Sequence, residues 1–217
     1  CQPFSVVGHQ KGKFDSRDGF PAFKACIEKT RPDLFVFENV RGMLYRNKDY
    51  FELICNELAS LGYIVDVRLI KMVNYGVPQN RERVFAVGHR GGFEFPKESE
   101  RKFTVGDALG DWANEAPSDG RYLTKSMDEY VARYEKKSKC ANPRDLYLDR
   151  PSRTLTCRNL ASATGDMIRV KLPDGRRRML RVKEGARLQG FPDWFEFIGE
   201  REEPYNQIGN AVPPIFS

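Results

Sequence analysis

The chain has 217 residues, of which 40% are hydrophobic and 30% charged, a composition typical of a globular protein that can bury an apolar core. No apolar run approaches the roughly 20 residues that a membrane-spanning helix requires, so no membrane partner is expected. The formal net charge is +6, and residues 121–181 hold 16 Lys and Arg against 7 Asp and Glu. This local surplus favours an anionic polymer such as nucleic acid as partner, although a solvated, lysine-rich surface would have the same composition.

The first part of the chain alternates between helical and extended patterns. Two segments carry apolar residues at helical spacing, Phe20–Arg31 and Asp49–Leu61. Three short runs are typical of strands, Leu34–Phe37, Tyr63–Met72 and Val84–Val87. The first of these runs suits a strand that is buried on both faces, as in a parallel sheet. Helix–strand alternation with short connections predicts an α/β layer with a parallel core.

The pattern changes after Gly91-Gly92. Residues 94–150 are polar, with weak periodicity and scattered Pro and Gly, and this change indicates a domain boundary near residue 93. Further along, Thr154–Thr156 and Ile168–Leu172 are predicted to be short strands. Lys183–Leu188 is predicted to be a short helix that ends at Gly190.

The number and spacing of cysteine and histidine residues argue against a metal site. The five cysteines are Cys1, Cys26, Cys55, Cys140 and Cys157. They are odd in number, lack C-x-x-C spacing and have no companion histidine cluster, which favours reduced thiols in a cytosol over zinc ligands or a disulfide framework. With only His9 and His89 present, a Ser-His-Asp hydrolase is also hard to build.

Four short signatures follow one another in a fixed order. They are Cys1-Gln2-Pro3-Phe4-Ser5, Glu38-Asn39-Val40, Gln79-Asn80-Arg81-Glu82-Arg83 and Gln207-Ile208-Gly209-Asn210-Ala211-Val212. Together, over nearly the whole chain, they resemble the cytosine-5 DNA methyltransferases. In that family the cysteine belongs to a Pro-Cys-Gln motif, of which the proline is not in this sequence. The N-terminal third that binds the cofactor, with its Phe-x-Gly-x-Gly turn, also has no counterpart here.

The resemblance implies an α/β fold with two domains. Residues 1–93 would form a Rossmann-like methyltransferase domain that lacks its first strands, residues 94–198 a smaller target-recognition domain, and residues 199–217 a return segment to the catalytic domain. We expect the chain to be inactive by itself unless a complementing N-terminal polypeptide supplies the missing strands.

The chemistry of cytosine methylation explains why the signatures contain a thiol, a carboxyl group and a guanidinium. Addition of a thiolate to carbon 6 makes carbon 5 able to attack an electrophilic methyl group. The addition places negative charge on N3 and O2 of the ring, where a carboxylic acid and a guanidinium would stabilise it. The resemblance gives these roles to Cys1, Glu38 and Arg83, with Arg81 and Gln79 supporting the pocket.

The residue pattern is consistent with these roles but leaves alternatives. Glu38 follows an apolar run, and parallel-sheet enzymes gather site residues at the carboxyl ends of strands; a carboxylate capping a turn would look the same. Arg81 and Arg83 alternate, so on an extended segment they would project to one side. A pair of exposed arginines entering a strand is the alternative.

Further contacts follow from the resemblance. S-adenosylmethionine is the implied cofactor, and Asn210 and Ala211 would contact its amino-acid portion. The target cytosine would be flipped out of double-stranded DNA because carbon 6 is shielded inside the stack. Gln2 and Ser5 would then contact the DNA from the loop after the cysteine. Arg153 and Thr154, at the end of the variable region, would help to read base edges.

These inferences converge on a DNA (cytosine-5-)methyltransferase of bacterial or phage restriction–modification type. An RNA cytosine methyltransferase is one alternative, and the basic variable region favours DNA over it. A non-catalytic DNA-binding subunit is another, which the missing cofactor turn leaves open. The intact set of Cys1, Glu38 and Arg83 argues against that alternative, because a protein that only binds has no need of a reactive thiol.

Overall fold

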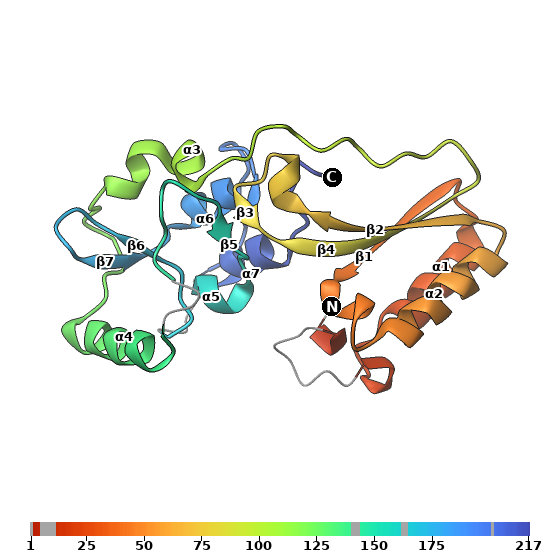
Figure 1. Cartoon of the computed structure of the whole chain (residues 1–217), viewed down its shortest axis with the longest axis horizontal. Coiled ribbons are helices and arrows are strands. Elements are labelled where there is room, and N and C mark those ends of the chain that lie inside the picture. The colour runs from red at the N-terminus through yellow and green to blue at the C-terminus, as the bar shows by residue number, and fades with distance from the viewer. Residues whose placement is uncertain (1, 5–11, 140–143, 162–164, 201) are drawn as a thin grey trace. The chain divides into compact units, whose positions relative to one another are not determined.

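The computed structural model describes residues 2–4, 12–139, 144–161, 165–200 and 202–217 (Figure 1). The chain divides into two compact units. Unit 1 comprises Cys1–Lys71 and Glu82–Lys97, and unit 2 comprises Met72–Arg81 and Glu98–Ser217. The chain leaves unit 1 for the last time after Lys97, a few residues beyond the boundary expected near residue 93. The assignment of functional domains stays a prediction. None of the helices in the described ranges is long and apolar enough to cross a bilayer.

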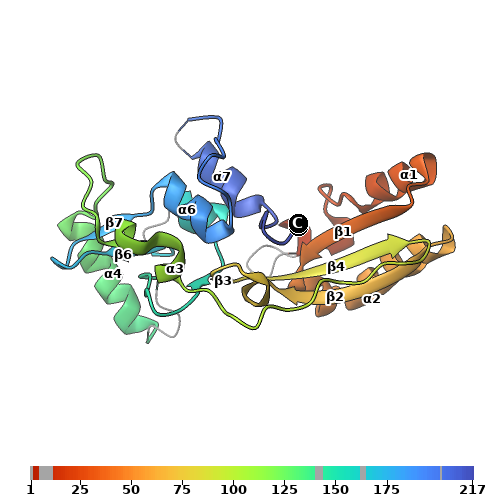
Figure 2. The same ribbon diagram turned by 90° about the horizontal axis from the view of Figure 1, so that it is seen from above.

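Unit 1 contains a three-stranded sheet in the order β1-β4-β2 (Figure 2). Its strands are β1 (Leu34–Val40), β2 (Ile64–Lys71) and β4 (Glu82–His89). Both outer strands are antiparallel to β4, so the parallel core expected from the sequence is wrong for this sheet. Strands β1 and β2 run in the same direction, as the helix that connects them requires. Strand β4 lies between them and runs in the opposite direction. Local periodicity does not reveal such an insertion.

One face of this sheet packs against two helices, α1 (Phe20–Thr30) and α2 (Lys48–Ser60). Phe35 and Val84 belong to this buried cluster, and the Phe35 ring lies so close to Gly88 that a Cβ there would be 2.0 Å from it. On β1 the alternate residue Val36 is 48% exposed. The expectation that this strand is buried on both faces is therefore wrong, and the strand follows the alternation of a sheet covered on one side.

Tyr50 of α2 contacts Phe4 of the first signature and Asp18, which lies just before α1. The Phe4 ring stacks on Tyr50 with centroids 5.9 Å apart. The Tyr50 hydroxyl donates a hydrogen bond to Asp18, whose other carboxylate oxygen accepts from the Phe20 amide at 3.1 Å. Burial raises the pKa of Tyr50, so its phenol stays protonated as a donor.

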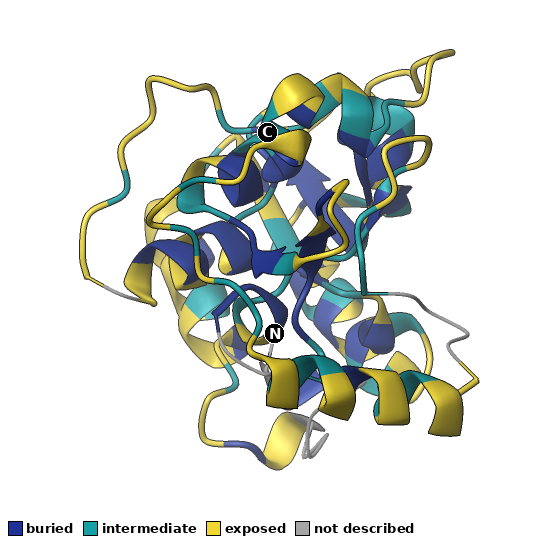
Figure 3. Ribbon diagram, turned by 90° about the vertical axis from the view of Figure 1, so that its left-hand side faces the viewer, coloured by how far each residue is buried: buried dark blue, intermediate teal, exposed yellow. Residues whose placement is uncertain are grey.

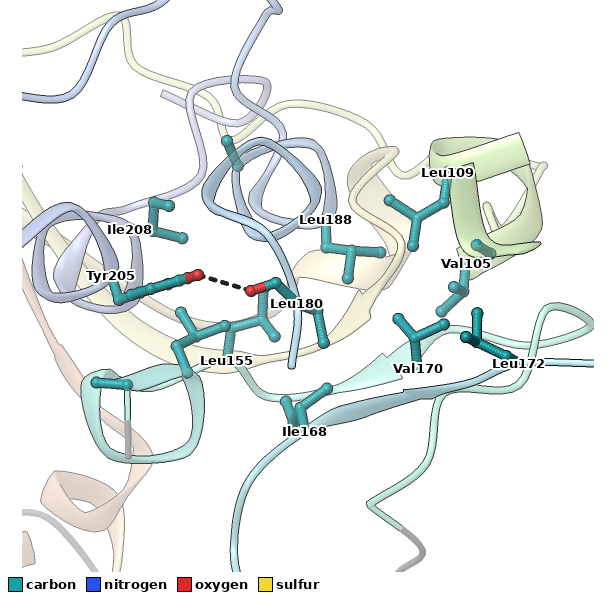
Figure 4. Packing of buried hydrophobic residues seen from close by; sticks show 14 residues of the cluster. Val105, Leu109, Leu155, Ile168, Val170, Leu172, Leu180, Leu188, Tyr205 and Ile208 are labelled. Atoms are coloured by element: carbon teal, nitrogen blue, oxygen red, sulfur yellow. Dashed lines mark hydrogen bonds between the residues drawn. The ribbon is translucent and has the colours of Figure 1, made fainter. Parts of the chain in front are cut away.

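Unit 2 is built from short helices around a small hairpin and contains the larger apolar cluster (Figure 4). Its helices are α3 (Val105–Leu109), α4 (Lys125–Lys137), α5 (Cys157–Ala161), α6 (Val182–Gln189) and α7 (Glu203–Asn210). Strands β6 (Arg169–Lys171) and β7 (Arg177–Met179) form the hairpin, and β3 (Gln79–Asn80) pairs in parallel with β5 (Ser152–Arg153). Leu155, Leu188 and Ile208 pack in the cluster, and the Tyr205 hydroxyl donates to the Leu180 carbonyl at 2.6 Å (Figure 4).

The predicted elements agree best with the structure where apolar residues recur at regular spacing within one segment. The predicted helices match α1, α2 and α6 to within one or two residues, and Gly190 caps α6 in the left-handed conformation with φ 85°. The strand predicted at Thr154–Thr156 lies instead at Ser152–Arg153. Helix α4 was not predicted, and Figure 3 shows that most of it is exposed.

Candidate active site

Glu38 and Arg83 lie together on one face of the unit 1 sheet. In the register of β1 and β4, Glu38 is opposite Phe85 and Arg83 is opposite Val40, so the two side chains are diagonal neighbours. The Arg83 Nε atom is 3.0 Å from Glu38 Oε1. Strand β1 continues past the predicted end at Phe37, so Glu38 lies within the strand instead of after it. The structure thus brings together two of the predicted catalytic residues.

The electrostatics of this pair are those of a partly desolvated ion pair. The side chains of Arg83 and Glu38 are 14% and 20% exposed. Burial lowers the pKa of Arg83, while the neighbouring Glu38 carboxylate opposes that shift. The Arg83 Nη1 atom also donates to the Glu82 carbonyl at 2.8 Å, which fixes the plane of the guanidinium. The guanidinium held this way can donate to an acceptor on a polar ring edge, whereas the carboxyl group accepts when ionised and donates to such an edge only when it carries a proton.

Gln79 is fully buried in unit 2 and joins three separate segments. Its Nε2 donates to Gln189 Oε1 at 2.7 Å and to the Leu188 carbonyl at 3.3 Å. Its Oε1 accepts from the Leu155 amide at 2.8 Å. These partners occupy the polar atoms of the Gln79 side chain. Gln79 therefore links the start of β3, the Leu155 segment and the end of α6 by hydrogen bonds.

Arg81 is likewise buried, with 1% of its surface exposed. Its Nη1 donates to the Leu155 carbonyl at 2.9 Å, and its Nη2 donates to the carbonyls of Gly209 and Ala211 at 3.3 and 3.0 Å. Arg83 makes its contacts in unit 1, whereas Arg81 makes them in unit 2. Between β3 and β4 the Arg81 amide donates to the Gln79 carbonyl at 2.9 Å in a tight turn, so the two arginines do not share the contacts that simple alternation predicts.

The C-terminal signature ends helix α7. Asn210 is the last residue of the helix and is exposed, and Ala211 follows it. The Ala211 carbonyl accepts hydrogen bonds from Arg81 and, at 2.7 Å, from Gln189 Nε2. Sequence reasoning missed Gln189 as a partner, because its contacts with the Gln79 side chain and the Ala211 carbonyl join segments that lie far apart in sequence or carry no side-chain pattern.

Cys1 and Ser5 lie outside the described residues, and Gln2 begins a short 3-10 helix, Gln2–Phe4. Their predicted roles therefore stay predictions. In the part of the chain that the structure describes, no group of three or more His, Cys, Asp or Glu side chains is placed to hold a metal ion.

Comparison with known proteins identifies the family. The profile of the C-5 cytosine-specific DNA methylases matches residues 1–216. The chain belongs to this family. It is 56% identical, over its whole length, to the type II methyltransferase M.AplI of Arthrospira platensis, and it spans 64% of that protein. It is 34% identical to M.NgoMIV of Neisseria gonorrhoeae, with 99% of the chain and 71% of that protein aligned. The chain is thus related to type II DNA (cytosine-5)-methyltransferases.

Solved structures support the same fold. The Entamoeba histolytica methyltransferase EhMeth matches with a TM-score of 0.68 at 16% identity, over 99% of this chain and 71% of that one. The Dnmt2 methyltransferase of S. pombe matches with a TM-score of 0.64 at 18% identity, over 98% and 72%. The mixed α/β fold of this chain therefore agrees with that of methyltransferases over part of their length.

The two residues predicted to read DNA are Arg153, the last residue of β5, and Thr154, which follows it. Arg153 pairs with Asp166, with Nη1 and Oδ1 3.1 Å apart. The Thr154 hydroxyl donates to the Asn80 carbonyl at 2.5 Å. Both side chains thus have partners inside unit 2, and a role in base reading stays a prediction.

Unit 2 also contains an open pocket of about 720 Å³. Its lining is mostly apolar, with one carboxylate and one guanidinium: Gly76, Pro78, Phe103, Asp107, Ala108, Arg187, Gly190, Phe191, Pro192, Pro214 and Ile215. Of the predicted catalytic and cofactor-binding residues that the structure describes, none lines it, so we do not assign the reaction to this pocket.

Proposed function

We propose that this chain carries out DNA (cytosine-5-) methylation within a restriction–modification system, acting on a cytosine flipped out of double-stranded DNA. The observation that carries the proposal is the Glu38–Arg83 pair, with its atoms 3.0 Å apart and its side chains mostly buried. Two relatives that are named type II methyltransferases support it. Because the chain spans 64% of the first of these relatives, activity, substrate and partners are proposed for the assembly that completes it.

In the proposed reaction each residue has one task. The Cys1 thiolate forms a bond to carbon 6, and the electron pair displaced from the ring's double bond makes carbon 5 nucleophilic. Glu38 holds or shares a proton at N3, and Arg83 stabilises the charge on O2. After carbon 5 gains the methyl group, a base removes its proton and the sulfur–carbon bond breaks, which restores the thiolate and the aromatic ring.

S-adenosylmethionine, the family's cofactor, would supply the electrophilic methyl group when bound. The exposed side chain of Asn210, at the end of α7, fits a ligand that carries polar amino-acid groups. Ala211 would contribute by position, since Arg81 and Gln189 both donate to its carbonyl and so fix the main chain beside Asn210. Gln79 and Arg81 would be positioning residues: they would hold this region in place by hydrogen bonds and would not touch the substrate.

Covalent trapping tests the proposal. DNA containing 5-fluorocytosine is incubated with labelled S-adenosylmethionine and the chain, by itself and with the N-terminal segment of a relative added. Fluorine cannot leave carbon 5 as a proton does, so the sulfur–carbon bond persists and a labelled, denaturation-resistant adduct is expected. Cys1→Ser should abolish the adduct, whereas Cys26→Ser, which removes an exposed thiol elsewhere, should leave it unchanged. DNA binding without an adduct in either mixture would instead support a non-catalytic DNA-binding subunit.

Helix α4 supplies a surface suited to the DNA backbone. Two of its three acidic residues, Asp128 and Glu135, pair with Arg177 and Arg169 of the hairpin, at 3.1 and 3.0 Å, while Glu129 is exposed. This pairing leaves four exposed cations on the helix, none with an ion-pair partner among the described residues: Lys125, Arg133, Lys136 and Lys137. We infer that these cations neutralise phosphates.

The salt dependence of DNA binding checks this inference. Replacing Lys136 and Lys137 by Gln is expected to reduce the slope of log K against log salt by about 0.9 for each phosphate that the variant no longer neutralises. Lys29→Gln, which removes an exposed cation from α1, serves as the control and should leave the slope unchanged. An unchanged slope in the double variant would mean that Lys136 and Lys137 do not neutralise phosphates.

A further inference from the structure

The main chain on both sides of Asn210 is fixed from within unit 2. The buried Arg81 guanidinium donates to the carbonyl before Asn210, that of Gly209, and to the carbonyl after it, that of Ala211. On the α5 side, Gly209 is in direct main-chain contact, since a Cβ there would lie 2.3 Å from the Cys157 nitrogen and 2.6 Å from the Thr156 carbonyl carbon. These contacts leave the side-chain torsions as the main freedom of Asn210.

Cys157 of α5 contacts that side chain directly. Its Sγ lies 3.1 Å from Asn210 Oδ1, and 3.6 Å from the Asn206 carbonyl oxygen. Desolvation by burial raises the pKa of the Cys157 thiol, so at neutral pH the sulfur carries its proton and donates. The amide oxygen of Asn210 is the nearer of its two acceptors.

This contact determines which end of the Asn210 amide faces outward. An S–H group needs an acceptor, and the amide of Asn can offer its oxygen but not its NH2 group for that purpose. With the oxygen turned to Cys157, the Nδ2 nitrogen is left to the exposed side. In the described part of the chain, Nδ2 has no hydrogen-bond partner, and Asn210 is exposed. The outward group is thus a donor.

We propose that Cys157 is a positioning residue for cofactor binding: its thiol holds Asn210 Oδ1, so that the Asn210 amide donates N–H bonds to the carboxylate of S-adenosylmethionine. This inference rests on the proposed function and adds to it a residue outside the four signatures. A donor at this position selects an acceptor group on the ligand, so the carboxylate is favoured over the α-ammonium group of the same amino-acid portion.

Equilibrium dialysis with labelled S-adenosylmethionine tests the proposal, on the full chain supplemented with the N-terminal segment of a relative. Cys157→Ala removes the donor and is expected to raise the dissociation constant roughly three- to tenfold, the loss of one hydrogen bond. Cys157→Ser retains a donor and should restore affinity to within about twofold of the original protein. Decarboxylated S-adenosylmethionine lacks the acceptor, and its affinity should not respond to Cys157→Ala.

A double-mutant cycle separates positioning from simple packing. In an Asn210→Ala background, Cys157→Ala should cause no further loss of affinity, because the thiol would act through the amide alone. Equal losses in both backgrounds, or an equal loss for the decarboxylated ligand, would overturn the assignment of Cys157 while leaving the proposed function standing. If the supplemented protein with its native residues binds no S-adenosylmethionine, both the proposed function and this inference fail.

Discussion

Replacing Glu184 by Gln is expected to destabilise unit 2 by about 3–5 kcal/mol, the cost of leaving one member of a buried ion pair without its counter-charge. Glu184 and Arg178 are both fully buried, and the two carboxylate oxygens each accept from the guanidinium at 2.8 Å. The remaining Arg178 donors bind the carbonyls of Glu115, Trp112 and Met179. Gln keeps the shape of the side chain but removes its charge, so the cation of Arg178 stays in the core uncompensated.

A matched variant separates the buried pair from a surface pair on the same carboxylate. Arg181 also contacts Glu184, with Nη2 3.0 Å from Oε1, but its side chain is 32% exposed. Arg181→Ala is therefore expected to cost at most about 1 kcal/mol. Both tryptophans of the chain, Trp112 and Trp194, belong to unit 2, so urea unfolding followed by tryptophan fluorescence reports on this unit. Equal losses for the two variants would mean that main-chain carbonyls suffice to hold the buried guanidinium.

The spacing of apolar residues along the chain was enough to predict the helices that bury one apolar face. Helices α1 and α2 bury Ile27, Ile54 and Leu58 at helical spacing, and these positions are readable along the chain. Helix α4 was missed although its apolar residues Met127, Tyr130, Val131 and Tyr134 follow helical spacing. Its many charged residues, among them Asp128 and Glu135 in ion pairs, make the segment polar on average, and this low hydropathy concealed a period that could be read.

Contacts between segments that lie far apart in the sequence were hard to predict, both in the sheet and in the candidate site. The apolar content of β4 predicted a strand, but its antiparallel pairing with both neighbours depends on contacts that lie far apart in sequence. The proximity of Glu38 and Arg83 was expected from the roles that the family resemblance gives them. The burial of Gln79 and Arg81 was not readable, because most of their partners are main-chain atoms, of Leu155, Gly209 and Ala211 among others, in segments far apart in sequence.

Glu38→Gln is expected to lower kcat for methyl transfer by roughly 10²- to 10⁴-fold, the contribution typical of a positioned general acid. Gln can still donate a hydrogen bond, but it cannot hold or share a proton with N3 when the ring accepts charge. The structure supplies a closely matched control in Glu82→Gln. Glu82 is on the neighbouring strand and also pairs with an arginine, at 2.7 Å from Arg41, and it has no proposed role, so kcat should be unchanged. Single-turnover methylation of a duplex substrate measures both variants.

The coupling between Glu38 and Arg83 makes the prediction more specific. Arg83→Lys keeps a positive charge but loses the fixed guanidinium plane, and we expect a fall of about 10²- to 10³-fold in kcat, as for removal of one oxyanion donor. Because the two side chains are 3.0 Å apart, the losses in the double variant should not add. Strict additivity would mean that the two residues stabilise the reaction independently. A Glu38→Gln enzyme with full activity would remove the carboxyl group from the mechanism, since the pair would then serve only to hold β1 against β4.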